Sequence, residues 1–232
     1  MKAIIHQPYF LPYPGFFHKL SLGDIFVIMD DVQYDKRFTN RNRIVKQNGW
    51  TWVTVPINKD DKFSSNMQVR INNELDWKEL QWKKISQTYA NSKYFHLYRD
   101  YFEKIYKQDW QYLFELDFET VKQVIRWLGI KIDIIKESEL GVNSTSTQRL
   151  VDVCKKIGAD TYVSGSGGRQ YMDESIFEKN NLKLIYQDYK HPKYPQKWTN
   201  EFIPDLSIVD LLANMGPDSM KVISGELIPD IT

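Results

Sequence analysis

Two histidines flank a proline-rich stretch near the start of the sequence, and their chemistry makes this stretch the first candidate site. His6 is followed by Gln7 and by residues 8–15, which contain three prolines, and His18 comes shortly after them. Histidine transfers protons near neutral pH, and a glutamine amide can orient a hydroxyl or an amide. If the stretch folds over the end of a strand, both imidazoles could face one cavity. Alternatively, each is a histidine at the edge of the core that bonds the backbone.

Two adjacent carboxylates, Asp30 and Asp31, follow the apolar run 25–29. A continuous apolar run is typical of a strand covered on both faces, as strands of a parallel sheet are. Both acids should then open onto the same sheet edge as His6, where they suit a general base or a contact to an amine or a ribose. The alternative is a solvated turn. The candidate catalytic residues are therefore His6, His18, Asp30 and Asp31.

A local excess of positive charge distinguishes residues 36–46, which hold five lysines and arginines in a chain of net charge +1. Arginine binds phosphate through two parallel hydrogen bonds, and asparagine amides between the arginines can fix sugar or amide groups. The segment predicts a phosphate or diphosphate ligand, such as a nucleotide or a nucleotide-sugar, bound by Arg41, Asn42 and Arg43. A solvated charged face is the alternative. Extended nucleic acid is not expected, because no second basic tract is present.

A glycine-rich turn follows a second buried-strand pattern, residues 160–164. Its residues Ser164, Gly165, Gly167 and Gly168 could hold an anion with backbone N–H groups, or they could form a plain tight turn. The turn matches neither the P-loop nor the dinucleotide-binding motif. A proline-stiffened loop farther on, residues 191–196, offers His191, Tyr194 and Gln196. Further candidate ligand contacts near these segments are Tyr9, Gln33 and Tyr171.

The elements that must position these residues follow an α/β pattern. Residues 2–30 read as strand, proline loop, short helix and strand, and residues 148–164 as helix, strand and glycine turn. Between them, residues 76–128 have helical periodicity. We expect a single α/β domain over residues 1–232, an open and mostly parallel Rossmann-like sheet with an α-helical insert at about 76–128. Ligands of such sheets bind at the carboxyl ends of the strands, so the proline loop, the basic segment and the glycine turn should share one pocket.

The overall composition limits the class of protein. The chain has 232 residues, 42% hydrophobic and 26% charged, with one cysteine and four histidines. A single cysteine excludes a disulfide-stapled secreted fold, and the scattered histidines show no zinc spacing, so we expect no metal. The near-zero net charge argues against attraction to anionic membranes, and no run approaches the ~20 apolar residues of a membrane span. With no signal-peptide pattern, we expect a cytoplasmic protein without membrane insertion.

An ordered set of motifs resembles the WbqC-like family over nearly the whole chain. The matching segments are residues 5–19, 30–34, 40–44, 162–165, 191–196 and 206–212. The resemblance implies a bacterial protein of O-antigen and capsule gene clusters. The activity it implies is transfer of glycine, another amino acid or an acyl group onto a sugar.

Taken together, these expectations describe an acyl or aminoacyl transferase. Its partners would be a nucleotide-linked amino-sugar, with its diphosphate on Arg41 and Arg43, and an acyl or aminoacyl donor. His6 or His18 would deprotonate the sugar amine, and N–H groups of the loops would stabilise the oxyanion. The sequence identifies no cofactor.

Two alternatives stay open. The opening also loosely resembles nucleotidyltransferases that bind ATP at a histidine-glycine motif, which favours ATP-dependent amide ligation with an adenylating step. Residues 13–16, Tyr-Pro-Gly-Phe, stand where those enzymes have histidines around the glycine. The other alternative, from a different class, is a non-catalytic sugar-nucleotide-binding protein.

Overall fold

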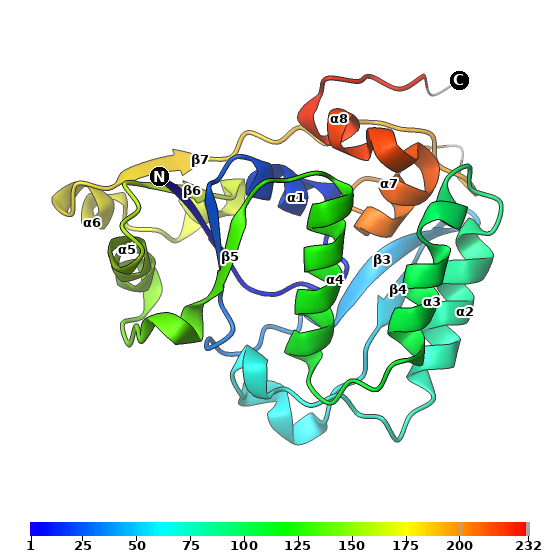
Figure 1. The fold of residues 1–232 in the computed structure, drawn as a ribbon, viewed down its shortest axis with the longest axis horizontal. Helices are drawn as coiled ribbons and strands as arrows, with labels where there is room; N and C mark the ends of the chain where they lie inside the picture. Colours follow the sequence, from blue (N-terminus) through cyan, green and yellow to red (C-terminus); the bar gives the residue numbers. More distant parts are fainter. Residues whose placement is uncertain (200, 231–232) are drawn as a thin grey trace.

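The computed structural model describes residues 1–199 and 201–230 and is built on a five-stranded parallel sheet (Figure 1). Its strand order is β5-β2-β1-β6-β7. The strands are β1 (Lys2–His6), β2 (Ile25–Ile28), β5 (Asp133–Lys136), β6 (Thr161–Ser164) and β7 (Lys183–Tyr186). Short runs of β-branched residues bounded by polar residues suit such buried strands. The predicted open, parallel α/β sheet is confirmed.

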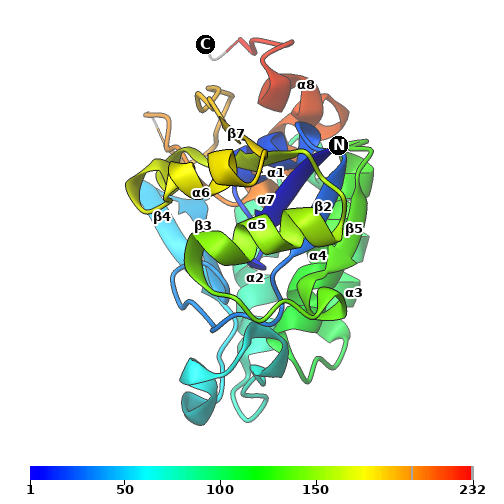
Figure 2. The same ribbon diagram turned by 90° about the vertical axis from the view of Figure 1, so that its left-hand side faces the viewer.

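Side-chain alternation along the strands divides the core into two layers. Ala3 and Ile5 of β1 pack with α5 (Ser146–Lys156) and α6 (Glu174–Lys179), whereas Ile4 belongs to the larger cluster on the opposite face. The opposite face is covered by α1 (Pro14–Ser21), α4 (Leu113–Trp127), α7 (Ile208–Met215) and α8 (Ser219–Ser224). Figure 2 shows α5 and α6 in front of the sheet and the other helices behind it. In the described part of the chain, no helix has the length and apolar character required to cross a membrane.

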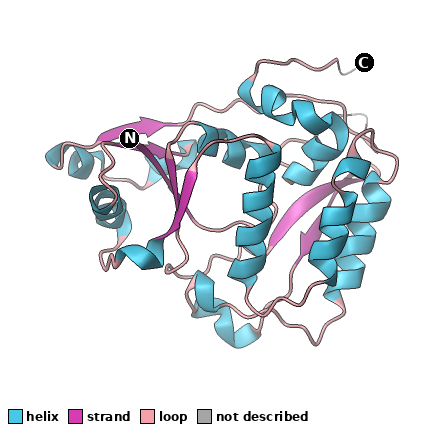
Figure 3. Cartoon of the chain, viewed as in Figure 1, coloured by secondary structure: helices cyan, strands magenta, loops and turns pink. Residues whose placement is uncertain are grey.

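The long connection between β2 and β5 carries a hairpin and the helical block. The hairpin pairs β3 (Arg41–Lys46) with β4 (Gly49–Thr54) in antiparallel register, apart from the main sheet (Figure 3). After it come α2 (Trp77–Tyr89) and α3 (Arg99–Lys107), followed by α4. The helical insert thus lies where the periodicity places it. The sequence pattern did not predict β3. A buried position of a strand normally carries an apolar residue, and in β3 the asparagine Asn42 takes such an inward-facing position.

The strand order creates a switch point beside β1. From β1 the chain first builds outward through β2 to β5, and it later returns to place β6 and then β7 on the other side of β1. The carboxyl ends of β1 and β6, at His6 and Ser164, therefore lie next to each other with their following loops diverging. This is the position at which open α/β sheets bind ligands.

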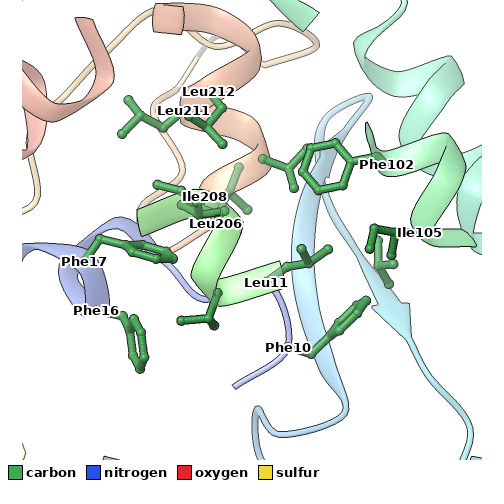
Figure 4. Close-up of a cluster of buried hydrophobic side chains, with 14 of the residues drawn as sticks. Phe10, Leu11, Phe16, Phe17, Phe102, Ile105, Leu206, Ile208, Leu211 and Leu212 are labelled. Carbon is green, nitrogen blue, oxygen red and sulfur yellow. The ribbon is translucent and has the colours of Figure 1, made fainter. Parts of the chain in front are cut away.

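The proline-rich loop after β1 is anchored in the core. Figure 4 shows Phe10 and Leu11 of this loop among apolar side chains from α1, α3 and α7. The Asn42 side-chain amide donates to the Leu11 carbonyl at 2.8 Å, and the Ile208 backbone N–H donates to the Pro12 carbonyl at 2.8 Å. Both contacts satisfy carbonyls that the prolines keep out of regular structure. The loop is thus a fixed wall beside the end of β1.

Candidate functional site

A cavity of about 830 Å³ lies at the switch point of the sheet. The end of β1 contributes His6 to its lining, the proline-rich loop contributes Gln7 and Tyr9, and β3 contributes Asn42 and Arg43. All three segments expected to meet, the loop, the basic segment and the glycine turn, line this one cavity.

The third wall comes from the turn after β6 and from the late proline-stiffened loop. The predicted residues found here are Ser164, Gly165, Gly167, Gly168, Tyr171 and His191. A Cβ added at Gly168 would overlap the Ser164 hydroxyl and would lie 2.6 Å from the Met172 methyl. Glycine at this position therefore lets the turn fold tightly against the end of β6.

His6 is held as a neutral imidazole. Its Nδ1 lies 2.8 Å from the Gln7 carbonyl, which makes Nδ1–H the donor and leaves Nε2 as an acceptor. Burial, aided by the nearby charge of Lys19, lowers the pKa of His6 to about 3. The ring sits edge-on to Tyr9 and Phe16, with centroids 4.7 and 5.2 Å away. His6 is therefore suited to accept a hydrogen bond from a ligand and is a weak proton acceptor at neutral pH.

His18 does not line the cavity, but it contacts two residues that do. Its Nδ1 lies 2.7 Å from Gln187 Nε2, which also donates to the Gly15 carbonyl at 2.8 Å. The His18 ring packs on Tyr189 at 5.1 Å, and burial lowers the pKa of His18. Gln187 and Tyr189 both line the cavity, so His18 orients lining residues that the sequence reasoning missed.

Lys19 is a lining residue that the sequence reasoning also missed. Phe16 and Lys19 of α1 and its N-cap residue Tyr13 are spaced every three residues and all line the cavity. The side chain of Lys19 is only 4% exposed, and burial lowers the pKa of its ammonium to about 7. A lysine on the apolar face of a short helix is the signal that could have identified it, because such lysines rarely stay buried without a function or a partner.

Four buried polar atoms in the lining have no hydrogen-bond partner among the described residues. They are Gln7 Oε1, Arg43 Nε, Tyr189 Oη and His191 Nε2. Buried polar atoms in folded proteins are nearly always paired, so each unpaired atom requires an explanation. The fold thus leaves four residues of this lining with a buried polar atom that no described residue satisfies.

The two central arginines of the basic segment have different environments. Arg43 lines the cavity, and its Nη2 donates to the Asp205 carbonyl at 3.0 Å. Both guanidinium groups lie over an indole ring, that of Arg41 4.4 Å from the Trp52 centroid and that of Arg43 5.3 Å from the Trp50 centroid. Arg41, however, lies outside the lining. Arg37, by contrast, does line the cavity, and its Nη2 forms a 2.6 Å ion pair with Asp35. Arg43 is thus the cavity cation of this segment that no carboxylate neutralises among the described residues.

Several predicted residues have positions that suit support rather than ligand contact. The Asn42 amide donates to the Phe10 and Leu11 carbonyls, so it positions the proline loop although it borders the cavity. Gln196 Nε2 donates to the Ile203 carbonyl at 2.9 Å and to Asp210 at 3.2 Å. Tyr194 is 1% exposed and lies outside the cavity lining.

The predicted carboxylates and one glutamine lie elsewhere. Asp30 is 1% exposed, and its oxygens accept from the Ser138 backbone N–H at 2.9 Å and hydroxyl at 2.7 Å. Asp30 lines a separate cavity, while Asp31 and Gln33 are exposed on the loop that follows. The two acids therefore do not share a site with His6, although later residues of the same loop, Asp35 and Arg37, do line its cavity.

Comparison with known proteins identifies the family to which the chain belongs. The model of the WbqC-like protein family matches residues 7–222. A protein of Mycobacterium tuberculosis named as uncharacterized protein Rv1507c is 30% identical over 221 residues, which cover 94% of this chain and 95% of that protein. No solved structure matches the chain. The chain belongs to the WbqC-like protein family.

Proposed function

We propose that the protein transfers an amino acid such as glycine, or another acyl group, to the amine of a nucleotide-linked amino-sugar in the biosynthesis of bacterial surface polysaccharide. The observation that carries this proposal is the meeting of an unneutralised arginine, a neutral histidine and four unpaired polar atoms in one cavity at the switch point. The family resemblance supplies the setting.

Each part of the cavity fits one part of such a substrate. Arg43 offers free N–H groups to a diphosphate, because its contact to Asp205 uses one nitrogen. The rings of Tyr9 and Tyr13 suit contact with a sugar or a base. Gln7 and His191, which line the cavity and each carry an unpaired polar atom, would pair with hydroxyl and amine groups of the sugar. Backbone N–H groups of the glycine turn would stabilise the oxyanion of the tetrahedral intermediate.

The reaction forms one bond and breaks another at the acyl carbon. The sugar amine attacks that carbon, a C–N bond forms, and the bond between the carbon and its carrier breaks. The amine loses one proton in this step, and a group in the cavity must accept it. His6 Nε2 can accept a hydrogen bond from the amine and so aim its lone pair at the acyl carbon.

ATP-dependent amide ligation is the second candidate, and one observation favours it. The sheet has the strand order in which nucleotides bind at the switch point, and the loop from β1 to α1 borders the cavity there. The segment 13–16 does not supply histidines for ATP phosphates, so transfer from an activated donor is the primary proposal.

Mass spectrometry of reaction mixtures distinguishes these functions. Purified protein is incubated with a UDP- or dTDP-linked amino-sugar and with glycine or an acyl thioester, with and without ATP. An acyl mass added to the sugar without ATP supports the transferase, and release of AMP or ADP supports ligation. Unchanged substrates, together with a melting temperature raised by the nucleotide-sugar, would replace both with a binding protein.

Two matched variants connect the reaction to the cavity. Gln7→Ala should raise KM for the nucleotide-sugar, because it removes an unpaired acceptor from the lining. Gln33→Ala should leave KM unchanged, because this exposed side chain lies outside the cavity. Equal effects of the two substitutions would contradict the assignment of the site.

A further inference from the structure

The position of Lys19 sets it apart from the other cations of the cavity. It lies on α1 one turn beyond Phe16, with the proline loop and the end of β1 beside it, and its side chain is 4% exposed. No residue that the structure describes forms an ion pair or a hydrogen bond with its ammonium. A buried, unpaired lysine is costly to the fold, and most proteins replace such a residue with an apolar one.

The groups around the cavity do not neutralise Lys19. The carboxylate of Asp35 is engaged by Arg37, and burial is the cause that lowers the pKa of Lys19, with no contribution from Asp35 or Asp205. His6, the titratable neighbour whose ring senses the charge of Lys19, carries no negative charge in any protonation state at neutral pH. The other titratable groups facing this space are Tyr9, Tyr13, Tyr162, Tyr171, Tyr189 and His191. Because burial raises the pKa of Tyr9, Tyr13 and Tyr189, these phenols stay protonated and supply no negative charge.

Burial without a counter-charge favours the neutral amine. The same burial makes His6 a poor base, since its pKa falls to about 3, whereas the pKa of Lys19 falls to about 7. A general base works best when its pKa lies near the pH of the reaction. Of the His6 imidazole and the Lys19 amine, Lys19 meets that condition.

We propose that Lys19 is the catalytic base of this cavity, and this inference rests on the proposed transfer to a sugar amine. The amine nitrogen forms a bond with the acyl carbon and passes its proton to the neutral Nζ of Lys19. The bond between the acyl carbon and its carrier then breaks, and the departing carrier takes the proton from the Lys19 ammonium. The lysine returns to its neutral form, and atoms and charge balance over the cycle.

The first test measures the protonation of Lys19 without any substrate. The protein is labelled with ¹³C at the lysine Cε, and the shift of each signal is followed from pH 5 to pH 11. Lys19→Arg identifies the Lys19 signal by its disappearance. We expect a midpoint near pH 7, about 3.5 pH units below those of the exposed lysines. A midpoint in the range of the exposed lysines would overturn the inference.

The second test separates a base from a phosphate-binding cation. Lys19→Arg keeps a positive charge but cannot accept a proton, and Lys19→Met fills the space without charge. We expect both to lower kcat by roughly 10²–10⁴-fold, while Lys19→Arg binds UDP with a Kd within threefold of the original protein. Lys83→Gln, on the exposed side of α2, is the matched control. Circular dichroism confirms that each variant is folded.

The outcomes distinguish this inference from the function on which it rests. Turnover by Lys19→Arg close to that of the original protein would exclude a role as base. A loss of UDP affinity equal to the loss of turnover would assign Lys19 to phosphate binding and overturn the inference. If the unaltered protein transfers no acyl group from any donor, the proposed function fails, and the NMR midpoint still decides whether Lys19 is neutral at physiological pH.

Discussion

Two cavities of similar size lie at the carboxyl edge of the sheet, and they differ in chemistry. The cavity at the switch point measures about 830 Å³, and the other, between the helical block and the ends of β2 and β5, measures about 720 Å³. In the switch-point cavity four buried polar atoms and the ammonium of Lys19 lack partners among the described residues. In the second cavity no buried polar side-chain atom of the described lining is unpaired.

The second cavity has polar groups that are already satisfied. Asp30 accepts two hydrogen bonds from Ser138, and the Trp110 indole donates to the Ile105 carbonyl at 2.9 Å. The Lys136 ammonium lies 5.6 Å from the ring centroid of Phe114. Such contacts hold strand ends against helices and require no ligand.

The difference shows why volume alone does not identify a site. A cavity prepared for a polar ligand contains groups that folding left unpaired, and the fold carries their cost until a ligand binds. We therefore expect unpaired polar groups to lower the stability of the unliganded protein at the switch-point cavity and not at the second cavity.

The largest expected effect is a pH-dependent gain in stability on replacing Lys19. The pKa of Lys19 is about 7 in the folded chain and 10.5 when exposed, so between these values the unfolded chain binds more protons. Stability contributed by this group therefore rises with pH from 7 to 10.5, by up to about 5 kcal/mol. Lys19→Met should be more stable than the original protein at pH 7 and lose this advantage toward pH 10. Urea unfolding at several pH values measures the difference, and a difference that is constant with pH would contradict the assignment.

Arg43→Ala should weaken binding of a nucleotide-sugar by about 1.5–3 kcal/mol, the range for a charge-assisted hydrogen bond, which is roughly 10–150-fold in Kd. Arg41→Ala is the matched control two residues away, and it should change Kd by less than threefold because its guanidinium lies over Trp52 outside the lining. Calorimetric titration with a UDP-amino-sugar measures both. Equal losses would mean that the positive charge of the strand, and not the cavity, governs affinity.

Two glycines of the same turn give a finer comparison. Gly168→Ala should cost about 1–3 kcal/mol of stability, since its Cβ would overlap the Ser164 hydroxyl. Gly167→Ala should cost less than about 0.5 kcal/mol, because nothing lies within 4 Å of an added Cβ there. Thermal unfolding of both variants provides the measurement. A destabilised Gly167→Ala with an unaffected Gly168→Ala would show that the turn has another conformation in solution.

Some features of the candidate site could be predicted from the sequence, and others depend on tertiary packing. The strand ends at His6 and Ser164 were predictable because prolines and glycines mark them locally, and the parallel order of their strands brings them together. The burial of Lys19 is a tertiary property, since the spacing along α1 shows a face but not what covers it. The different environments of Arg41 and Arg43 were equally hidden, because the two alternate positions share one face of β3 and only packing decides which one meets the cavity.

The smallest expected effect tests the second cavity. Ser138→Ala removes the hydroxyl that donates to Asp30 at 2.7 Å but keeps the backbone N–H that donates at 2.9 Å, so Asp30 retains one partner. The loss should be about 1 kcal/mol of unfolding free energy, the net value of one hydrogen bond, with no change in Kd for the nucleotide-sugar. Chemical denaturation and calorimetry measure the two quantities. A weakened Kd with unchanged stability would show that the second cavity also takes part in binding, because a purely supporting contact can affect the ligand only through the fold.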